Sequence, residues 1–231
     1  ACNPLYNRLV WGYWPSRFHS FTKELVAMDE GWYLDAGCGL GRMAFERSSA
    51  HTLSVGVDLS TAFVAAARGV MQTGRVTCRS RIEGDLYQEV EAEIPGDWRP
   101  DRVEFLVADV TALPFRRCFA AVSSLNILDK VPAPWAHLAE LDRVALDREA
   151  ELLLSDPFSW SEEVAPRSAW LGGTAEGPYA GRGLDNVRRL LSEGAFTHPW
   201  SLDEPFTVEW RLRNHANHAE DIRSQGFRAE R

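Results

Sequence analysis

Residues 32–42 of this chain read Trp-Tyr-Leu-Asp-Ala-Gly-Cys-Gly-Leu-Gly-Arg, and this stretch decides the fold. Its first three residues form a short apolar run typical of a buried strand, which we expect to end at Asp35. Glycines then occupy the alternate positions 37, 39 and 41, and residues 42–48 are predicted to continue as a helix. Glycine allows the backbone to adopt positive φ and to approach a ligand closely, and the free N–H groups of a first helical turn face that ligand. The stretch therefore predicts a cradle for a nucleotide-like ligand.

The glycine spacing distinguishes between two kinds of ligand. A dinucleotide fingerprint has glycines at relative positions 1, 3 and 6, and here the sixth position is Arg42, which disfavours a nicotinamide cofactor. The pattern Asp-x-Gly-x-Gly-x-Gly instead resembles motif I of the class I S-adenosylmethionine (SAM) methyltransferases. The resemblance implies SAM as cofactor and S-adenosylhomocysteine as product. It assigns cofactor binding to Asp35, Gly37, Cys38, Gly39, Gly41 and Arg42. The alternative is a glycine-rich strand-to-helix turn without a ligand.

Composition limits the class of protein. The chain has 231 residues, of which 45% are hydrophobic, and this suits one α/β domain spanning residues 1–231. The net charge of −8 argues against a general nucleic-acid binder. We see no apolar run of membrane-spanning length and no signal peptide, so no membrane partner is expected. The four cysteines are widely spaced, which favours reduced thiols in a cytoplasmic protein.

Strands and helices are predicted to alternate along the rest of the chain, as in a doubly wound, mostly parallel sheet of seven strands with a Rossmann-like order. After the first strand, further strands are expected at 53–57, 103–108, 119–124, 151–154, 196–202 and 222–227. Helices are expected at 60–71, 134–146 and 183–193. Ligands of such sheets lie at the carboxyl ends of the strands.

Polar residues follow several of these strand ends. Asp58 comes about 20 residues after the glycines, a spacing that suits a carboxylate accepting hydrogen bonds from two ribose hydroxyls. The alternative role for Asp58 is to cap the helix that follows. In the methyltransferase pattern, the acidic residue at the position of Asp109 meets the adenine amino group. The same resemblance adds Leu59, Val110, Ser124 and Leu125 to the cofactor site.

Four segments lie outside the repeating pattern. Residues 1–29, with a helix over 17–28, are expected to form a cap over the cofactor, and residues 74–101 an inserted hairpin or irregular flap. The long, glycine-rich and aromatic connection 157–183 is interpreted as a substrate lid. Residues 205–220 stay ambiguous, and His215 and His218 within them are too few to bind a metal, so no metal site is predicted.

Several segments resemble a narrower family. They are Asp-Arg-Val-Glu-Phe-Leu at 101–106, Asn-Ile-Leu-Asp-Lys-Val-Pro at 126–132, Ser-Asp-Pro-Phe-Ser-Trp at 155–160 and Trp-Leu-Gly-Gly at 170–173. Together they are similar to the mercaptohistidine N-methyltransferases of ovothiol biosynthesis, which methylate an imidazole nitrogen of a thiolated histidine. The chain departs from that family at 213–220, where a basic-aromatic segment is replaced. The iron-dependent sulfur-transfer domain that often precedes the family domain is not found in these residues.

The resemblance suggests a mechanism with a small-molecule acceptor. Imidazole has a pKa of about 6.5, so it needs the correct tautomer more than a strong base. Asp129 is the candidate to accept the other ring N–H, with Asn126 orienting the substrate, although Asp129 could equally cap the following turn. Trp160, Trp170 and Tyr179 are candidates to stack on the ring or exclude water. Methylation of another small molecule or of a protein histidine, and SAM binding without catalysis, stay open.

Overall fold

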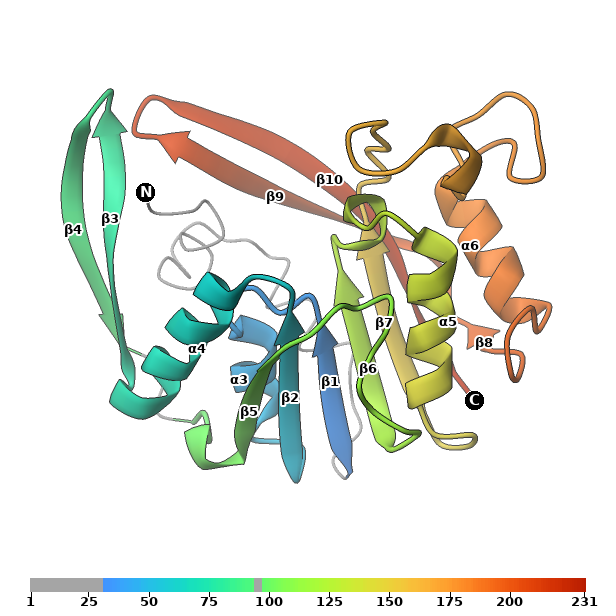
Figure 1. Cartoon of the computed structure of the whole chain (residues 1–231), viewed down its shortest axis with the longest axis horizontal. Coiled ribbons are helices and arrows are strands. Elements are labelled where there is room, and N and C mark those ends of the chain that lie inside the picture. Colours follow the sequence, from blue (N-terminus) through green and yellow to red (C-terminus); the bar gives the residue numbers. More distant parts are fainter. Residues whose placement is uncertain (1–30, 94–96) are drawn as a thin grey trace.

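A computed structural model describes residues 31–93 and 97–231 of the chain. The helix expected at 17–28 and the cap expected at 1–29 lie outside the described residues. The central sheet has eight strands, in the order β5-β2-β1-β6-β7-β10-β8, with β9 pairing β10 (Figure 1). Its strands are β1 (Trp32–Ala36), β2 (Leu53–Asp58), β5 (Val103–Val107), β6 (Phe119–Leu125), β7 (Glu151–Asp156), β8 (Ser201–Leu202), β9 (Phe206–His215) and β10 (His218–Glu230).

The strand pairing confirms a doubly wound, mostly parallel sheet. The strands from β5 to β7 all pair in parallel, and β10 pairs antiparallel with β7, β8 and β9. The prediction of seven strands is one too few, because the ambiguous residues 205–220 contain β9. Another difference is that the strand expected at 196–202 is reduced to the two residues of β8. β1 also runs past Asp35 to Ala36.

Helices cover both faces of the sheet (Figure 1). They are α3 (Arg42–Arg47), α4 (Thr61–Thr73), α5 (Pro134–Val144) and α6 (Gly183–Ser192). Side chains of β1 pack alternately on the two faces of the sheet, because successive strand side chains point in opposite directions. Leu34 and Ala36 pack in one cluster with Leu138 of α5 and Val187 of α6. The other face carries a second cluster, in which Phe45 of α3 packs with residues of α4 and β5.

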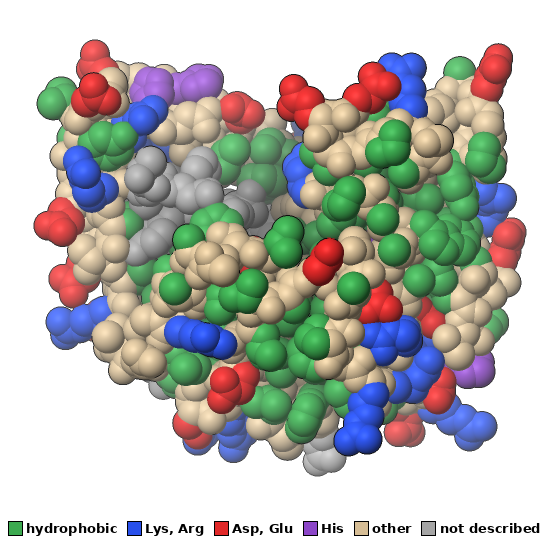
Figure 2. All heavy atoms as spheres, viewed as in Figure 1, with side chains coloured by type: hydrophobic (Ala, Val, Ile, Leu, Met, Phe, Trp, Pro, Cys, Tyr) green, Lys and Arg blue, Asp and Glu red, His purple; other side chains and the backbone are tan. Residues whose placement is uncertain are grey.

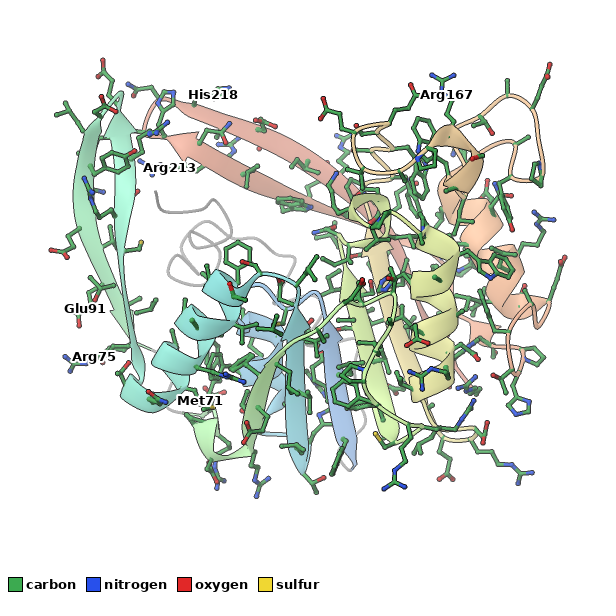
Figure 3. The ribbon with its side chains drawn as sticks, viewed as in Figure 1. Met71, Arg75, Glu91, Arg167, Arg213 and His218 are labelled. Carbon is green, nitrogen blue, oxygen red and sulfur yellow. The ribbon has the colours of Figure 1, made fainter. Side chains whose placement is uncertain are left out.

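The insertion at 74–101 contains a separate two-stranded hairpin, β3 (Arg75–Glu83) and β4 (Leu86–Glu93). Burial alternates along the first half of β3, where Val76, Cys78 and Ser80 are buried. The long β9–β10 hairpin reaches across to it, and the two hairpins form an arch above the carboxyl ends of the parallel strands (Figures 1 and 3). Hydrogen bonds join them: Arg213 Nη1 donates to Ser80 Oγ at 2.6 Å, and the Ala216 N–H donates to the Ile82 carbonyl at 3.0 Å.

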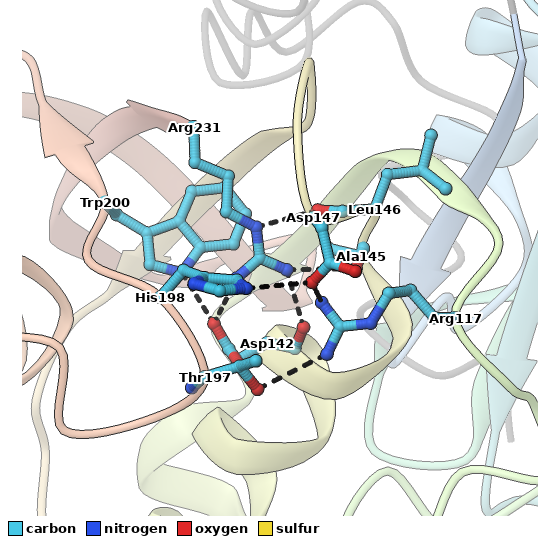
Figure 4. A network of polar contacts seen from close by, with 9 residues as sticks. All are labelled: Arg117, Asp142, Ala145, Leu146, Asp147, Thr197, His198, Trp200 and Arg231. Carbon is cyan, nitrogen blue, oxygen red and sulfur yellow. Dashed lines mark hydrogen bonds and ion pairs between the residues drawn. The ribbon is translucent and has the colours of Figure 1, made fainter.

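A buried ion pair connects the end of β10 to α5 (Figure 4). Arg231 Nη1 lies 2.5 Å from Asp142 Oδ1, and the guanidinium also donates to three backbone carbonyls at the end of α5. Trp200 completes the cluster, because its indole N–H donates to Asp142 and its ring lies 4.2 Å from the guanidinium carbon. Burial opposes ionisation of Asp142, but hydrogen bonds from Thr197 and Trp200 and the charge of Arg231 still lower its pKa. The network holds the antiparallel edge of the sheet against the helix layer.

Candidate functional site

The glycine turn adopts the conformation that the sequence predicts. Gly37, Gly39 and Gly41 have φ of 85°, 55° and 84°, in the left-handed region that other residues avoid. The N–H groups of Gly37 and Cys38 both donate to the Val57 carbonyl at 2.9 and 2.8 Å, which ties the turn to the end of β2. A Cβ at Gly37 would lie 2.3 Å from Ile127 Cδ1. The turn is therefore pressed against its neighbours, and only glycine fits there.

Asp58 lies at the end of β2 beside this turn. Its Oδ2 accepts from the Gly39 N–H and its Oδ1 from the Ser60 N–H, both at 2.9 Å. Each carboxylate oxygen can accept a further bond, so the ribose role predicted for Asp58 is compatible with these contacts. The cap of α4 comes instead from Ser60, whose Oγ accepts from the Phe63 N–H. Leu59 is 71% exposed, an apolar surface beside the turn that could cover a flat ring.

Asp109 lies on the adjacent loop after β5. It is exposed, and its Oδ1 accepts from the N–H and the hydroxyl of Thr111, which lowers its pKa. The next residue, Val110, is buried, and its backbone carbonyl is hydrogen-bonded to the His137 ring.

Sequence reasoning missed His137, although it lies on the buried face of α5 with Leu138 and Leu141. Burial lowers the pKa of His137 to about 4, so the ring is neutral at pH 7. Nδ1 faces the Val110 carbonyl at 3.2 Å, and since a carbonyl only accepts, Nδ1 carries the proton. Nε2 then accepts from the Ser124 hydroxyl at 2.7 Å. His137 thus joins the Asp109–Val110 loop to the end of β6.

Asp35 is buried under the turn, on the α3 side of β1. Its Oδ1 accepts from Ser123 Oγ at 3.1 Å, and Ser123 Oγ also lies 2.5 Å from the Tyr33 hydroxyl. Burial and the neighbouring carboxylates of Asp58 and Glu46 raise the pKa of Asp35 to about 7, against which its hydrogen bonds act. Asp35 therefore supports the turn from beneath.

Two further predicted cofactor residues are engaged within the protein. Cys38 is buried, which raises the pKa of its thiol, and its Sγ lies 3.7 Å from the Gly39 carbonyl. Arg42 forms an ion pair with Glu46 one turn along α3, at 2.8 Å.

The end of β6 and the loop after it carry Leu125, predicted for the cofactor, and Asn126, predicted for the acceptor. Leu125 packs with Val208 and Trp210 of β9. Asn126 has a φ of 62°, a strained value outside glycine, and its N–H donates to the Ser155 carbonyl at 2.7 Å. Its Oδ1 accepts from Ser224 Oγ at 2.6 Å, whereas its Nδ2 is buried without a hydrogen-bond partner among the described residues.

Asp129 and Asp156 form a buried acidic pair at the ends of β6 and β7. The Asp129 N–H donates to Asp156 Oδ2 at 3.2 Å, and Asp129 Oδ2 accepts from the Ser159 N–H at 2.7 Å. Burial, followed by the charge of Asp129, raises the pKa of Asp156, which therefore holds a proton more tightly than an ordinary carboxyl. The ammonium of Lys130 lies 3.2 Å from Asp129 Oδ1. The pair fastens the beginning of the lid to the loop after β6.

The aromatic residues of the 157–183 connection line two neighbouring pockets. Trp160 and Trp170 lie nearly parallel, 6.3 Å apart and 17° between planes, and both line cavities. Trp160 contributes to a pocket of about 730 Å³ between the lid, α6 and the β9–β10 hairpin. Trp170 and Tyr179 contribute to a neighbouring pocket of about 560 Å³ within the lid. Figure 2 shows the surface hollowed between the lid and the hairpin.

The remaining expectations concern metals, thiols and membranes. His215 and His218 face each other at the tip of the β9–β10 hairpin, with ring centroids 5.5 Å apart. Within 31–93 and 97–231, no group of three or more histidine, cysteine or acidic side chains is arranged to hold a metal. Cys38, Cys78 and Cys118 are free thiols. None of the helices in the described part of the chain has the length and apolar character needed to cross a membrane.

Comparison with known proteins places this geometry in a family. Residues 34–148 match the methyltransferase domain family. The chain resembles the solved YcgJ protein of Bacillus subtilis with a TM-score of 0.59 at 11% identity, over 93% of this chain and 98% of that one. It resembles a SAM-dependent methyltransferase of Methanosarcina mazei with a TM-score of 0.55 at 18% identity, over 91% and 96% of the two chains. Magnesium protoporphyrin IX methyltransferase of Synechocystis, solved with bound S-adenosylhomocysteine, gives a TM-score of 0.54 at 17% identity, over 94% and 83%. No curated protein sequence matches the chain.

Proposed function

From the premise that this chain is a class I SAM-dependent methyltransferase, as its matched domain and its fold establish, we propose that it methylates an imidazole nitrogen of a small thiohistidine-like molecule. The residues present suit SAM. The glycine turn has three residues at positive φ, which lets the backbone approach a ligand closely, and Asp58 and the exposed Leu59 lie beside it. When bound, SAM supplies an activated methyl group on a sulfonium. The chain's own residues then have to hold the acceptor in line with that methyl group and exclude water.

One observation carries the choice of acceptor. The three segments that most resemble the mercaptohistidine methyltransferases, 126–132, 155–160 and 170–173, are distant in sequence but meet at one place. Asp129 bonds to Asp156 and Ser159, and Trp160 stacks against Trp170. A Cβ on Gly173 would lie 2.8 Å from Trp160 Cδ1, so the glycine allows the indole its position. Their contact supports a shared role beside the reacting acceptor.

Within this proposal, Asp129 selects the imidazole tautomer and Asn126 orients the ring. Asp129 Oδ1 forms an ion pair with Lys130 but no hydrogen bond with the described residues, so it is the oxygen that we assign to the ring N–H. The buried Nδ2 of Asn126 is a second donor that a substrate would satisfy. Because Asp129 is only 1% exposed, the beginning of the lid has to move before an acceptor reaches it.

Titration with SAM and S-adenosylhomocysteine, followed by transfer assays with thiohistidine, histidine and a histidine peptide, tests the proposal. We expect micromolar cofactor binding and transfer to thiohistidine. Asp129→Asn should reduce turnover at least tenfold while leaving SAM affinity within twofold, whereas the exposed Asp203→Asn should change neither. Transfer to the peptide alone would indicate a protein-histidine methyltransferase. Cofactor binding without transfer to any of the three would exclude the imidazole acceptor.

A further inference from the structure

The pocket of about 730 Å³ between the lid and the β9–β10 hairpin lies next to the proposed reaction centre. Its wall begins at Pro157 and Phe158, the residues that follow the buried Asp156 at the end of β7. The Phe158 N–H donates to Asp156 Oδ1 at 2.7 Å, so this wall is attached to the acidic pair. The volume is typical of sites for small molecules.

The charges in this pocket differ from those of the whole chain. The charged residues among its described lining are Arg182, Arg223 and Glu209, which sum to +1 in a chain with a net charge of −8. Arg223 and Glu209 are paired across the hairpin at 2.8 Å. Arg182 lies at the N-cap of α6, and its guanidinium has no ion pair or hydrogen bond within the described part of the chain. The Arg182 guanidinium is thus available to a ligand. The exposed Glu209 carboxylate is paired with Arg223 and still has lone pairs that can accept from a further donor.

An indole provides a second unsatisfied donor. Trp160 Nε1 is buried and has no hydrogen-bond partner among the described residues, while the ring of Trp160 lines the same pocket. A buried donor without a partner is costly, and an acceptor atom of a ligand would remove that cost. A carboxylate has two acceptor oxygens and can serve both a guanidinium and an indole N–H.

We propose that this pocket binds the α-amino-acid group of the acceptor, with Arg182 and Trp160 Nε1 holding its carboxylate and Glu209 its ammonium. The inference rests on the proposed function, because it gives the histidine-like acceptor its anchoring point. An amino acid anchored there would extend its ring past Phe158 toward the ends of β6 and β7. A pocket lined by both a guanidinium and a carboxylate matches a zwitterion better than either a simple acid or a simple amine.

Binding measured by calorimetry with S-adenosylhomocysteine present tests the subsite independently of turnover. The probes are histidine, histamine, which lacks the carboxylate, and imidazole-4-propionate, which lacks the amine. The wild type should bind histidine at least tenfold more tightly than either analogue. Arg182→Gln should weaken histidine binding about ten- to a hundredfold and abolish the discrimination against histamine. Glu209→Gln should abolish the discrimination against imidazole-4-propionate.

Two variants serve as matched controls. Arg167→Gln removes an exposed lid arginine (Figure 3). Its guanidinium lies over the Trp170 ring, and it does not line this pocket. Asp221→Asn removes the acid of the exposed Arg211–Asp221 pair on the same hairpin. Both should bind the three probes as the wild type does.

The outcomes separate the subsite from the proposed function. Equal affinity for the three probes, no binding of any of them, or unchanged discrimination in Arg182→Gln would overturn the subsite. Transfer to thiohistidine decides the proposed function by itself. Transfer that is equally efficient with a decarboxylated thiohistidine would leave the proposed function standing and refute the subsite.

Discussion

Replacement of Asp35 by asparagine should change how the stability of this protein depends on pH. Asparagine keeps the shape of the side chain and an oxygen that can accept from Ser123, but it cannot ionise. Asp35 is buried, and its pKa of about 7 compares with an ordinary value of 3.8. The folded state therefore retains the Asp35 proton up to about pH 7, whereas the unfolded chain releases it near pH 4.

The sign and size of the effect follow from this difference. Between about pH 4 and pH 7 the folded state binds more protons than the unfolded chain, so this group makes the free energy of unfolding decrease as pH rises. One pKa unit corresponds to about 1.4 kcal/mol, so a shift of roughly three units gives about 4 kcal/mol. In Asp35→Asn, the free energy of unfolding should not show this decrease with rising pH. Its free energy of unfolding relative to the wild type should rise by about 4 kcal/mol from pH 4 to pH 7 and then level off.

Urea denaturation of both proteins at half-unit steps from pH 4 to pH 8 measures the effect. Subtracting one curve from the other removes the contributions that the two proteins share. An exposed aspartate, changed in Asp101→Asn, provides the control for the removal of one acidic side chain. A difference between Asp35→Asn and wild type that stays constant across this range would refute the assignment of a raised pKa to Asp35.

Three further predictions concern the turn, the helix layer and the buried ion pair. Gly37→Ala should raise the Kd for SAM at least tenfold, because an L-residue at positive φ costs roughly 1–2 kcal/mol and its Cβ would also clash with Ile127. The control is Gly69→Ala in α4, where a Cβ meets nothing within 4 Å, and this variant should leave the Kd unchanged. Burial lowers the pKa of His137 from 6.5 to about 4. The free energy of unfolding should therefore fall by roughly 3 kcal/mol as pH decreases from about 6.5 to about 4. Denaturation curves of His137→Gln should lack this acid sensitivity. Arg231→Met should lower the free energy of unfolding by about 3–5 kcal/mol, since it leaves a buried charge on Asp142 unpaired; a loss below about 1 kcal/mol in urea denaturation would contradict this.

Much of the cofactor edge could be predicted from the sequence, because the features involved are local. Three alternate glycines favour a turn with repeated positive φ, and they adopt it. Asp58 follows an apolar run at the expected spacing and does lie beside the turn. β9 could have been predicted as well, since Phe206, Val208, Trp210 and Leu212 alternate with polar residues as in a half-buried strand.

The tertiary structure alone decided the roles of the groups whose neighbours come from distant elements. Sequence spacing does not show that Asp129 bonds to Ser159 or that Asp156 is buried beside it. Nor does it show that Trp160 lines one pocket while Trp170 and Tyr179 line another. Backbone conformation and strand periodicity depend on a residue and its near neighbours, so the sequence by itself determined the parallel strands and the glycine turn. Burial, charge and the position of a pocket depend on which elements pack together, and only the folded chain decides that.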